Sequence, residues 1–435
     1  MKLRSIYRAY LNGLFLGAVA FLLMLVSCSE NEINPNGGGS DNSGDGSEPT
    51  DTVYRGYADP AGTILLNCGD RITENGSITY IAPDGSITED LYKKVNGTDL
   101  GNEAQALYLN NGKIYILCAD YFRLEGKPGD GALIIVDAVT FKKEKCFRLE
   151  DLRFTEPEGI TNPDFEPIPV GLSSLAVMDE HNIFICDDNG LYRFDSTTGE
   201  LNLLEESFRV DNGGAGVAGR VFTRGLAIVQ DKLYVAVGGW TSATDEYNLG
   251  IYEYEKGSNK LCRKLGIVNG GNVSAVCAGP DDTVWFVTYK YNNSGSNRIY
   301  RVDTKTMTVL DSKRVSDDLD SGIGNSLGVS VFDQTFYYSG MTTCLRRFDY
   351  QTGKSEQLVD AKDDEPNANF VTCNPVYDAK KNLLYIATTE KFMEGVVSTD
   401  HILVYDCQVY PPVLKQKISG KTSYVVGIYP MSIFY

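Results

Sequence analysis

The chain has 435 residues and carries 58 acidic against 40 basic side chains, which gives a formal net charge of −18. A chain this acidic repels nucleic acid and anionic lipid surfaces, so we expect no nucleic-acid partner. Its length exceeds that of one ordinary domain, but repeat proteins and all-β folds reach this size as a single unit.

The N-terminal 27 residues have the pattern of a secretory signal peptide. Lys2, Arg4 and Arg8 precede the apolar run 14–26, which is too short to predict a membrane-spanning helix. The run ends in "LVSC", which resembles the lipobox of bacterial lipoproteins. That resemblance implies cleavage before Cys28, a lipid on its thiol and attachment to a membrane through this anchor. The alternative is an ordinary signal peptide with an incidental cysteine.

An acidic patch and a polar linker follow the cysteine. Ser29, Glu30 and Glu32 resemble the surface-export signal of Bacteroidota lipoproteins, which implies an outer-membrane protein that faces the cell exterior. The alternative is the ordinary charge of a solvated linker. Residues 28–52 are rich in Gly, Ser, Asn and Asp and cannot bury a core, so they predict a flexible tether. We therefore divide the chain into a signal peptide (1–27), a lipidated tether (28–52) and one folded domain (53–435).

The folded region repeats one pattern at intervals of about 50 residues. A turn residue opens a short apolar strand with a central aromatic ring, as in "GKIYIL", "HNIFIC", "DKLYVA", "DTVWFV", "QTFYYS" and "NLLYIA". Another short apolar run precedes each of these strands. A third strand ends in Asp, Thr or Gly turn chemistry, as in "GLYRFDSTTG", and a fourth follows. Four-stranded units repeated around a ring predict an all-β fold, a seven-bladed β-propeller.

Seven blades are reached only by joining the two ends of the chain. Near the N-terminus, "GTILLN", "GSITYIAPDG" and "SITEDLYKKV" supply the second, third and fourth strands of a blade that lacks its first. The C-terminal run "GIYPMSIFY" (427–435) supplies that first strand. We expect this closure to leave no open sheet edge, and we expect removal of about ten C-terminal residues to unfold the ring.

Ten cysteines include Cys28, and the other nine lack C-x-x-C spacing. Several lie in apolar strands, for example Cys118, Cys186 and Cys277, where they read as buried small hydrophobic side chains. One or two disulfides remain open, without assigned pairs.

The loops that join successive blades, and those between the second and third strands, share one face of a propeller. Aromatic residues on such loops offer flat contact surfaces for a large ligand, and the alternative is that they pack blade against blade. Polar candidates on these loops are amides and two arginines, for which an inter-blade ion pair is the alternative. The candidate ligand-binding residues are Tyr121, Phe122, Trp240, Tyr289, Tyr291, Phe392, Arg220, Arg224, Asn325 and Asn374.

Catalytic patterns are sparse. The only histidines are His181, expected in an exposed turn on the opposite face, and His401, expected at the start of the third strand of the last blade. No Ser-His-Asp or H-E-x-x-H arrangement is present, and the acidic stretch 316–325 lacks the order of a calcium loop. We therefore expect a binding protein rather than an enzyme, with no catalytic residues, no metal site and no cofactor.

The run "GTILLNCGDRITENGSITYIAPDGSITEDLYKKVNGTDLGNEAQALYLNNGKIYILCAD", with the closing "VVGIYPMSIFY", resembles a family of Bacteroidota surface lipoprotein propellers. That family includes the cobalamin-capturing partners of TonB-dependent vitamin B12 transporters. The chain departs from it at Asn67-Cys68-Gly69, where the family often has "NEG". The resemblance implies capture of a scarce small-molecule nutrient, with cobalamin as the favoured ligand and a TonB-dependent outer-membrane transporter as the partner. Iron-chelate or haem capture, glycan or protein binding, and a propeller enzyme such as a lyase are the alternatives.

Overall fold

The computed structural model describes most of the chain from Arg55 to the C-terminus. The described ranges are 55–70, 72–121, 123–158, 165–187, 190–207, 209–210, 218–219, 222–238, 250–266, 272–280, 282–289, 297–315, 327–330, 334–339, 342–390, 400–421 and 424–435. The predicted signal peptide and tether lie outside these ranges.

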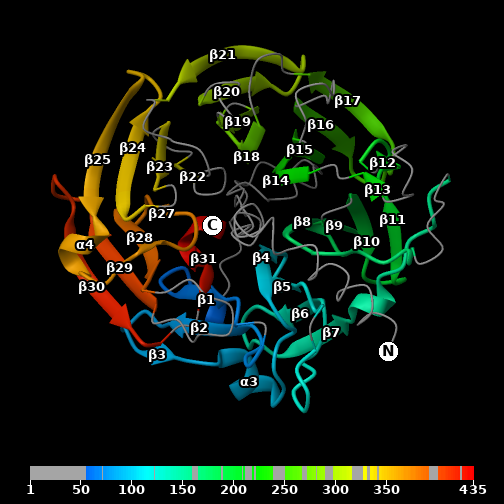
Figure 1. The fold of residues 1–435 in the computed structure, drawn as a ribbon, viewed down its shortest axis with the longest axis horizontal. Coiled ribbons are helices and arrows are strands. Elements are labelled where there is room, and N and C mark those ends of the chain that lie inside the picture. The colour runs from blue at the N-terminus through cyan, green and yellow to red at the C-terminus, as the bar shows by residue number, and fades with distance from the viewer. Residues whose placement is uncertain are drawn as a thin grey trace, which may run out of the picture.

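Seven antiparallel sheets stand around a central axis, which confirms the predicted seven-bladed β-propeller (Figure 1). Blade 2 consists of β4 (Ala104–Asn110), β5 (Lys113–Cys118), β6 (Leu133–Asp137) and β7 (Lys143–Phe147), and blade 3 consists of β8 (Ser174–Asp179), β9 (Asn182–Cys186), β10 (Leu191–Asp195) and β11 (Glu200–Leu203). Blade 4 consists of β14 (Phe222–Val229), β15 (Lys232–Gly238), β16 (Gly250–Glu255) and β17 (Leu261–Gly266), and blade 5 consists of β18 (Asn272–Ala278), β19 (Thr283–Tyr289), β20 (Arg298–Asp303) and β21 (Thr308–Arg314). Blade 6 consists of β22 (Leu327–Ser330), β23 (Thr335–Tyr338), β24 (Cys344–Asp349) and β25 (Lys354–Asp360).

Blade 7 has a divided inner strand. Its strands are β26 (Phe370–Val371), β27 (Val376–Asp378), β28 (Leu383–Thr389), β29 (Asp400–Asp406) and β30 (Val413–Ser419), and both β26 and β27 pair with β28. Pro375 lies between the two short strands, and proline cannot donate a ladder hydrogen bond. A small two-stranded sheet of β12 (Arg209–Val210) and β13 (Ala218–Gly219) lies outside the blades.

Blade 1 is closed by the C-terminal strand, as predicted. β31 (Val425–Pro430) pairs antiparallel with β1 (Thr63–Asn67), which continues to β2 (Ser77–Ile81) and β3 (Ile87–Thr88). The first strand and the last therefore lie side by side (Figure 1). All six residues of β31 are buried, so closure also completes the hydrophobic core of this blade.

The predicted outer strand of blade 1 is mostly wrong. Only Ile87–Thr88 is extended, and the rest of "SITEDLYKKV" enters the helix α3 (Leu91–Asn96). Leu91 and Tyr92 bury one side of this helix against blade 1, and Gly97 ends it with a left-handed φ of 74°. A glycine that follows a last turn with lysines, as Gly97 does here, signals the end of a helix, and the strand prediction did not take this signal into account.

The blades pack through apolar and aromatic side chains between neighbouring sheets. Trp285 of blade 5 lies 5.2 Å from Phe336 of blade 6, and Phe147 of blade 2 lies 4.8 Å from Phe194 of blade 3, both measured between ring centroids. These aromatic contacts fix one blade on the next. The nine cysteines after Cys28 are all free thiols, and five of them are buried, which agrees with their reading as small core residues.

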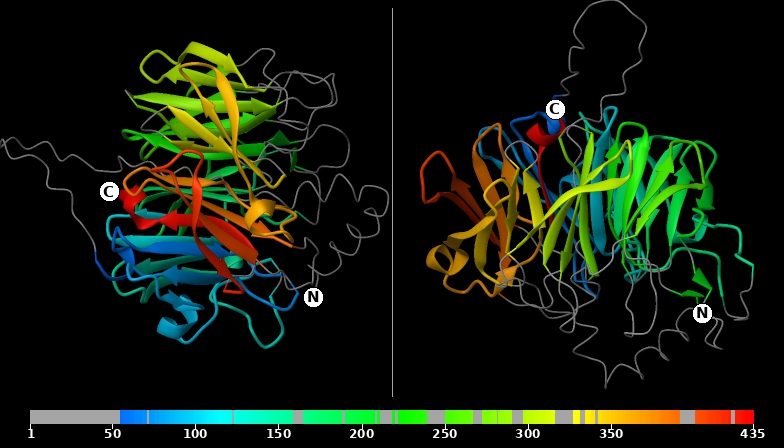
Figure 2. Two further views of the ribbon diagram at one scale, coloured as in Figure 1. Left: turned by 90° about the vertical axis from the view of Figure 1, so that its left-hand side faces the viewer. Right: turned by 90° about the horizontal axis from the view of Figure 1, so that it is seen from above.

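The two faces of the ring differ in what they carry. The described N-terminal residues and the C-terminal 3-10 helix η4 (Met431–Phe434) lie on one face, where the amide of Tyr57 donates to Val139 O at 3.1 Å and the Tyr435 hydroxyl donates to Ala58 O at 2.8 Å (Figure 2). We call this the turn face, because the short turns within each blade lie there. The opposite loop face carries the connections between blades. Within the described part of the chain no helix is long and apolar enough to cross a membrane.

Candidate binding face

Backbone bulges interrupt the innermost strands near the loop face. Opposite β5, Gln105 is an extra residue of β4, and opposite β19, Ser274 is an extra residue of β18. Val426 is the extra residue of β31, and β14 shifts register between Thr223 and Leu226. Bulges re-aim side chains and are frequent beside binding sites. Together with the divided strand of blade 7, they place an irregular rim around one end of the central axis.

The structure describes four of the ten candidate residues, and of two of these only the backbone. Tyr121 is half-buried and packs against the hydrophobic cluster that runs through blades 2 to 4. Tyr289 is the last residue of β19 and Arg224 lies within β14, so both belong to strands rather than to the loops in which the sequence placed them. Both strands continue further than the sequence predicted. Tyr289 still pairs with Asn272, and Thr223, next to Arg224, still pairs with Val237. The other candidates lie outside the described residues, as does the lipidation site: Phe122, Trp240, Tyr291, Phe392, Arg220, Asn325 and Cys28.

Asn374 lies in the break of the inner strand of blade 7. Val371 pairs with Thr388 and Val376 with Tyr385, so the segment between them holds two more residues than the facing part of β28. The Oδ1 atom of Asn374 is buried and has no hydrogen-bond partner among the described residues. An unsatisfied buried amide oxygen costs about 1–3 kcal/mol, and a ligand that donates a hydrogen bond would recover that cost.

Acidic groups also lie on this face. The Asp120 side chain is fully buried beside Arg123, whose Nη2 lies 3.5 Å from its Oδ2. Burial raises the pKa of Asp120, and the attraction of Arg123 opposes that rise. Asp187 has a structural role, because its carboxylate accepts from the amides of Val170 at 2.6 Å and Gly190 at 2.7 Å.

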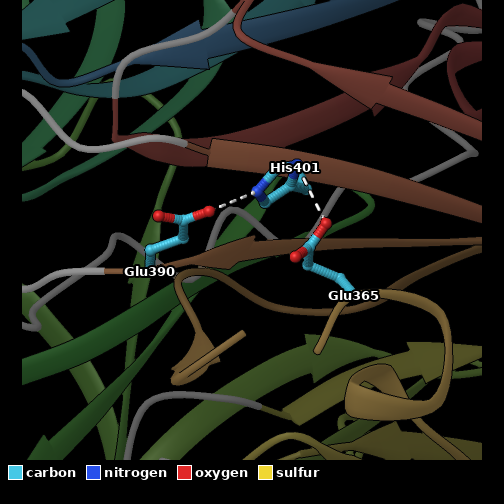
Figure 3. Close-up of side chains that lie close together, drawn as sticks. All are labelled: Glu365, Glu390 and His401. Atoms are coloured by element: carbon cyan, nitrogen blue, oxygen red, sulfur yellow. Dashed lines mark hydrogen bonds and ion pairs between the residues drawn. The ribbon is translucent and has the colours of Figure 1, made fainter. Parts of the chain in front are cut away.

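A histidine and two glutamates meet beside blade 7 on the loop face, and Figure 3 shows their side chains. Glu365 follows the short helix α4 (Ala361–Asp364), Glu390 follows β28, and His401 is the second residue of β29. Nδ1 of His401 lies 3.5 Å from Glu365 Oε2, and its Nε2 lies 3.4 Å from Glu390 Oε1. The side chains of His401 and Glu365 are more than nine-tenths buried. The predicted position of His401 is confirmed, but sequence reasoning missed its two carboxylate neighbours.

Further polar groups surround this cluster. Ser419 Oγ lies 2.8 Å from His401 Nδ1, and the Lys417 ammonium lies 2.5 Å from Glu365 Oε2. The hydrogen bond from Lys417 is the main cause that holds the pKa of Glu365 below its ordinary value. The arrangement of one imidazole beside two carboxylates offers nitrogen and oxygen atoms that can bind a cation.

The second histidine lies on the turn face, as expected. The His181 side chain is 55% exposed, and its Nδ1 lies 3.0 Å from Asp195 Oδ2. The hydrogen bond to Asp195 raises the pKa of His181. This exposed pair is remote in the fold from the cluster of blade 7, because it joins the turns of blade 3.

Comparison with known proteins places this chain in a family. It belongs to the family described as "Domain of unknown function (DUF5074)", whose model matches residues 61–424. Among solved structures, the β-propeller domain of Myceliophteria thermophila Cps50 (Swd1) is similar at 10% sequence identity and a TM-score of 0.44, over 73% of this chain and 86% of that chain. A search of curated proteins found no match. None of these comparisons names a lipoprotein or a cobalamin-binding protein, so that finer resemblance stays a prediction.

Proposed function

We propose that this propeller is a surface-anchored lipoprotein of the outer membrane that captures a bulky, scarce nutrient on its loop face. Cobalamin or a related corrinoid is the ligand that we favour, and a TonB-dependent transporter is the partner that receives it. On this account the protein binds its ligand without chemical change and is not an enzyme.

The position of the first described residues, on the face opposite the loop face, carries the proposal. The first described residue, Arg55, enters the ring on the turn face, whereas the bulged inner strands open toward the loop face. A flexible tether of about 25 residues has a root-mean-square span of about 25–30 Å. A lipid on Cys28 would thus hold the ring near the membrane and keep its loop face free. The tether would also raise the effective concentration of the propeller at a transporter in the same membrane.

The irregular rim of the inner strands carries amide side chains, which suits a ligand with many amide groups. A corrinoid has a flat macrocycle with amides on its periphery, so it can meet aromatic loop residues and amide side chains at the same time. Gln105 and Asn374 lie at two of the inner-strand irregularities, and no described residue donates a hydrogen bond to the buried Oδ1 of Asn374. Amide groups of the ligand would supply that donor.

Uptake by cells tests capture and transfer together. Cells that carry the wild-type chain should take up labelled cyanocobalamin at low concentration faster than cells that lack it. Cys28→Ala should lose this advantage, although the purified variant should still bind ligand, because only the anchor is removed. Equal uptake by all three strains would contradict the proposal, and a Cys28→Ala strain with wild-type uptake would contradict the anchor.

A further inference from the structure

We propose that Glu365, Glu390 and His401 form a site for one divalent transition-metal ion of the zinc class on the loop face of blade 7. One ligand atom from each residue can be chosen so that all three lie within 4.8 Å of one another. The site is separate from the nutrient-binding proposal, because it rests on these side chains and not on the tether or the rim.

The donor set selects the class of ion. One imidazole nitrogen and two carboxylate oxygens are ligands that Zn²⁺ accepts at about 2.0–2.2 Å, usually in a tetrahedral arrangement. Calcium and magnesium bind almost exclusively to oxygen ligands, so a site with a histidine nitrogen does not favour them. Three protein ligands would leave a fourth position for water or for a donor atom of another molecule.

Neighbouring groups hold the histidine in a binding orientation. His401 is paired in register with Ser419 on β30, and the Ser419 hydroxyl lies 2.8 Å from Nδ1. Metal-bound histidines usually donate a hydrogen bond from their other ring nitrogen in this way. In that tautomer Nε2 presents a lone pair toward Glu390 Oε1, 3.4 Å away. Glu365 Oε2 lies 3.5 Å from Nδ1, on the other side of the ring, so the Glu365 carboxylate has to turn toward Nε2 to share the ion. Two acceptors that face each other are stabilised by a cation between them.

Both carboxylates are positioned from the same turn. The amide of Asn367 donates to Glu365 Oε1 at 3.2 Å, and its side-chain nitrogen lies 3.4 Å from Glu390 Oε1. These contacts restrict the two glutamates to the neighbourhood of the imidazole. Ligand atoms that lie up to 4.8 Å apart have to move closer together to share one zinc ion in a tetrahedral arrangement.

Lys417 competes with a metal for Glu365. Its ammonium lies 2.5 Å from Glu365 Oε2, so it neutralises part of the negative charge that would attract the metal ion. The lysine side chain is about one-third exposed and sits on the outer strand β30, so it can turn toward solvent. Removal of this lysine should therefore strengthen metal binding, whereas removal of a group with only a structural role would not.

The two histidines of the chain provide a matched pair of variants. Zn²⁺ is titrated into the purified protein against a chromogenic chelator, with His401→Ala as the test and His181→Ala as the control. We expect His181→Ala to match the wild type and His401→Ala to lose one equivalent of zinc, or to bind it at least about tenfold more weakly. Cys146 and Cys262 are exposed free thiols in both variants, so any zinc that they bind cancels in the difference and the difference isolates the imidazole.

Two further measurements keep the test decisive if His401→Ala folds poorly. Zinc should shift the imidazole resonance of His401 but not that of His181 in a histidine-labelled wild-type sample, and Glu390→Gln should weaken that binding. Lys417→Ala should tighten it. An unshifted His401 resonance, or zinc binding that is the same in the wild type, His401→Ala and Lys417→Ala, would overturn the proposal.

Discussion

Ile428 lies in the middle of the closing strand β31, so its truncation tests whether this strand holds the ring together. Its side chain is 2% exposed and pairs in register with Leu65 of β1. Replacement by alanine removes methyl and methylene groups worth about 0.8 kcal/mol each and leaves a cavity. We expect the free energy of unfolding to fall by about 2–5 kcal/mol, the range for such core truncations.

Urea unfolding followed by circular dichroism measures this loss. The control is Val413→Ala on the outer strand β30, where the valine is 52% exposed and the change should stay within about 0.5 kcal/mol. Equal losses in the two variants would show that β31 does not carry the closure. A chain that ends at residue 424 goes further, since it removes the whole strand. It should lose cooperative unfolding, and a folded, protease-resistant product would refute the closure argument.

Two other positions give sharp expectations. A Cβ atom at Gly427 would lie 2.5 Å from the Tyr429 ring, so Gly427→Ala should cost about 1–3 kcal/mol, whereas Gly266→Ala, with open space around it, should cost little in the same urea experiment. Asp195→Asn should lower the pKa of His181 toward its ordinary value of 6.5, as followed by proton NMR. Because the folded pKa is raised, the stabilisation from this exposed pair is fully present below about pH 6.5 and disappears as pH rises through the folded value. An unchanged His181 titration would contradict the pairing.

The architecture was predictable because every blade repeats the same local signals. Aromatic strands such as "DKLYVA" and turn sequences such as "DSTTG" each specify a strand or a turn within a few residues. Closure was predictable because the blade near the N-terminus had no first strand of its own in the sequence, whereas the C-terminal residues contained a strand pattern that belonged to no other blade. Helix α3 was missed because "SITEDLYKKV" was assigned to the fourth strand that each blade requires. Its apolar residues Ile87, Leu91, Tyr92 and Val95 have helical spacing, and the stop signal at Gly97 follows them.

The candidate site was less accessible to sequence reasoning. Glu365 and Glu390 come from two different connections and His401 from strand β29, so the three meet only after blade 7 has folded, and their spacing matches no short motif. With 58 acidic residues in the chain, no pair of carboxylates stands out. The rarity of histidine was the one available signal, but His401 was only placed at the start of its strand and not proposed as a site residue. The inner-strand bulges depend on pairing register, which a single strand sequence does not specify.

The most direct test of the proposed function is a calorimetric titration of cyanocobalamin into the purified protein. We predict tight one-to-one binding by the wild type and by Asn202→Ala, an asparagine on the outer strand β11. Asn374→Ala should bind about 5- to 150-fold more weakly, as expected for loss of one buried hydrogen bond of about 1–3 kcal/mol. No heat of binding with the wild type would contradict corrinoid capture. Equal affinity of the two asparagine variants would remove Asn374 from the site.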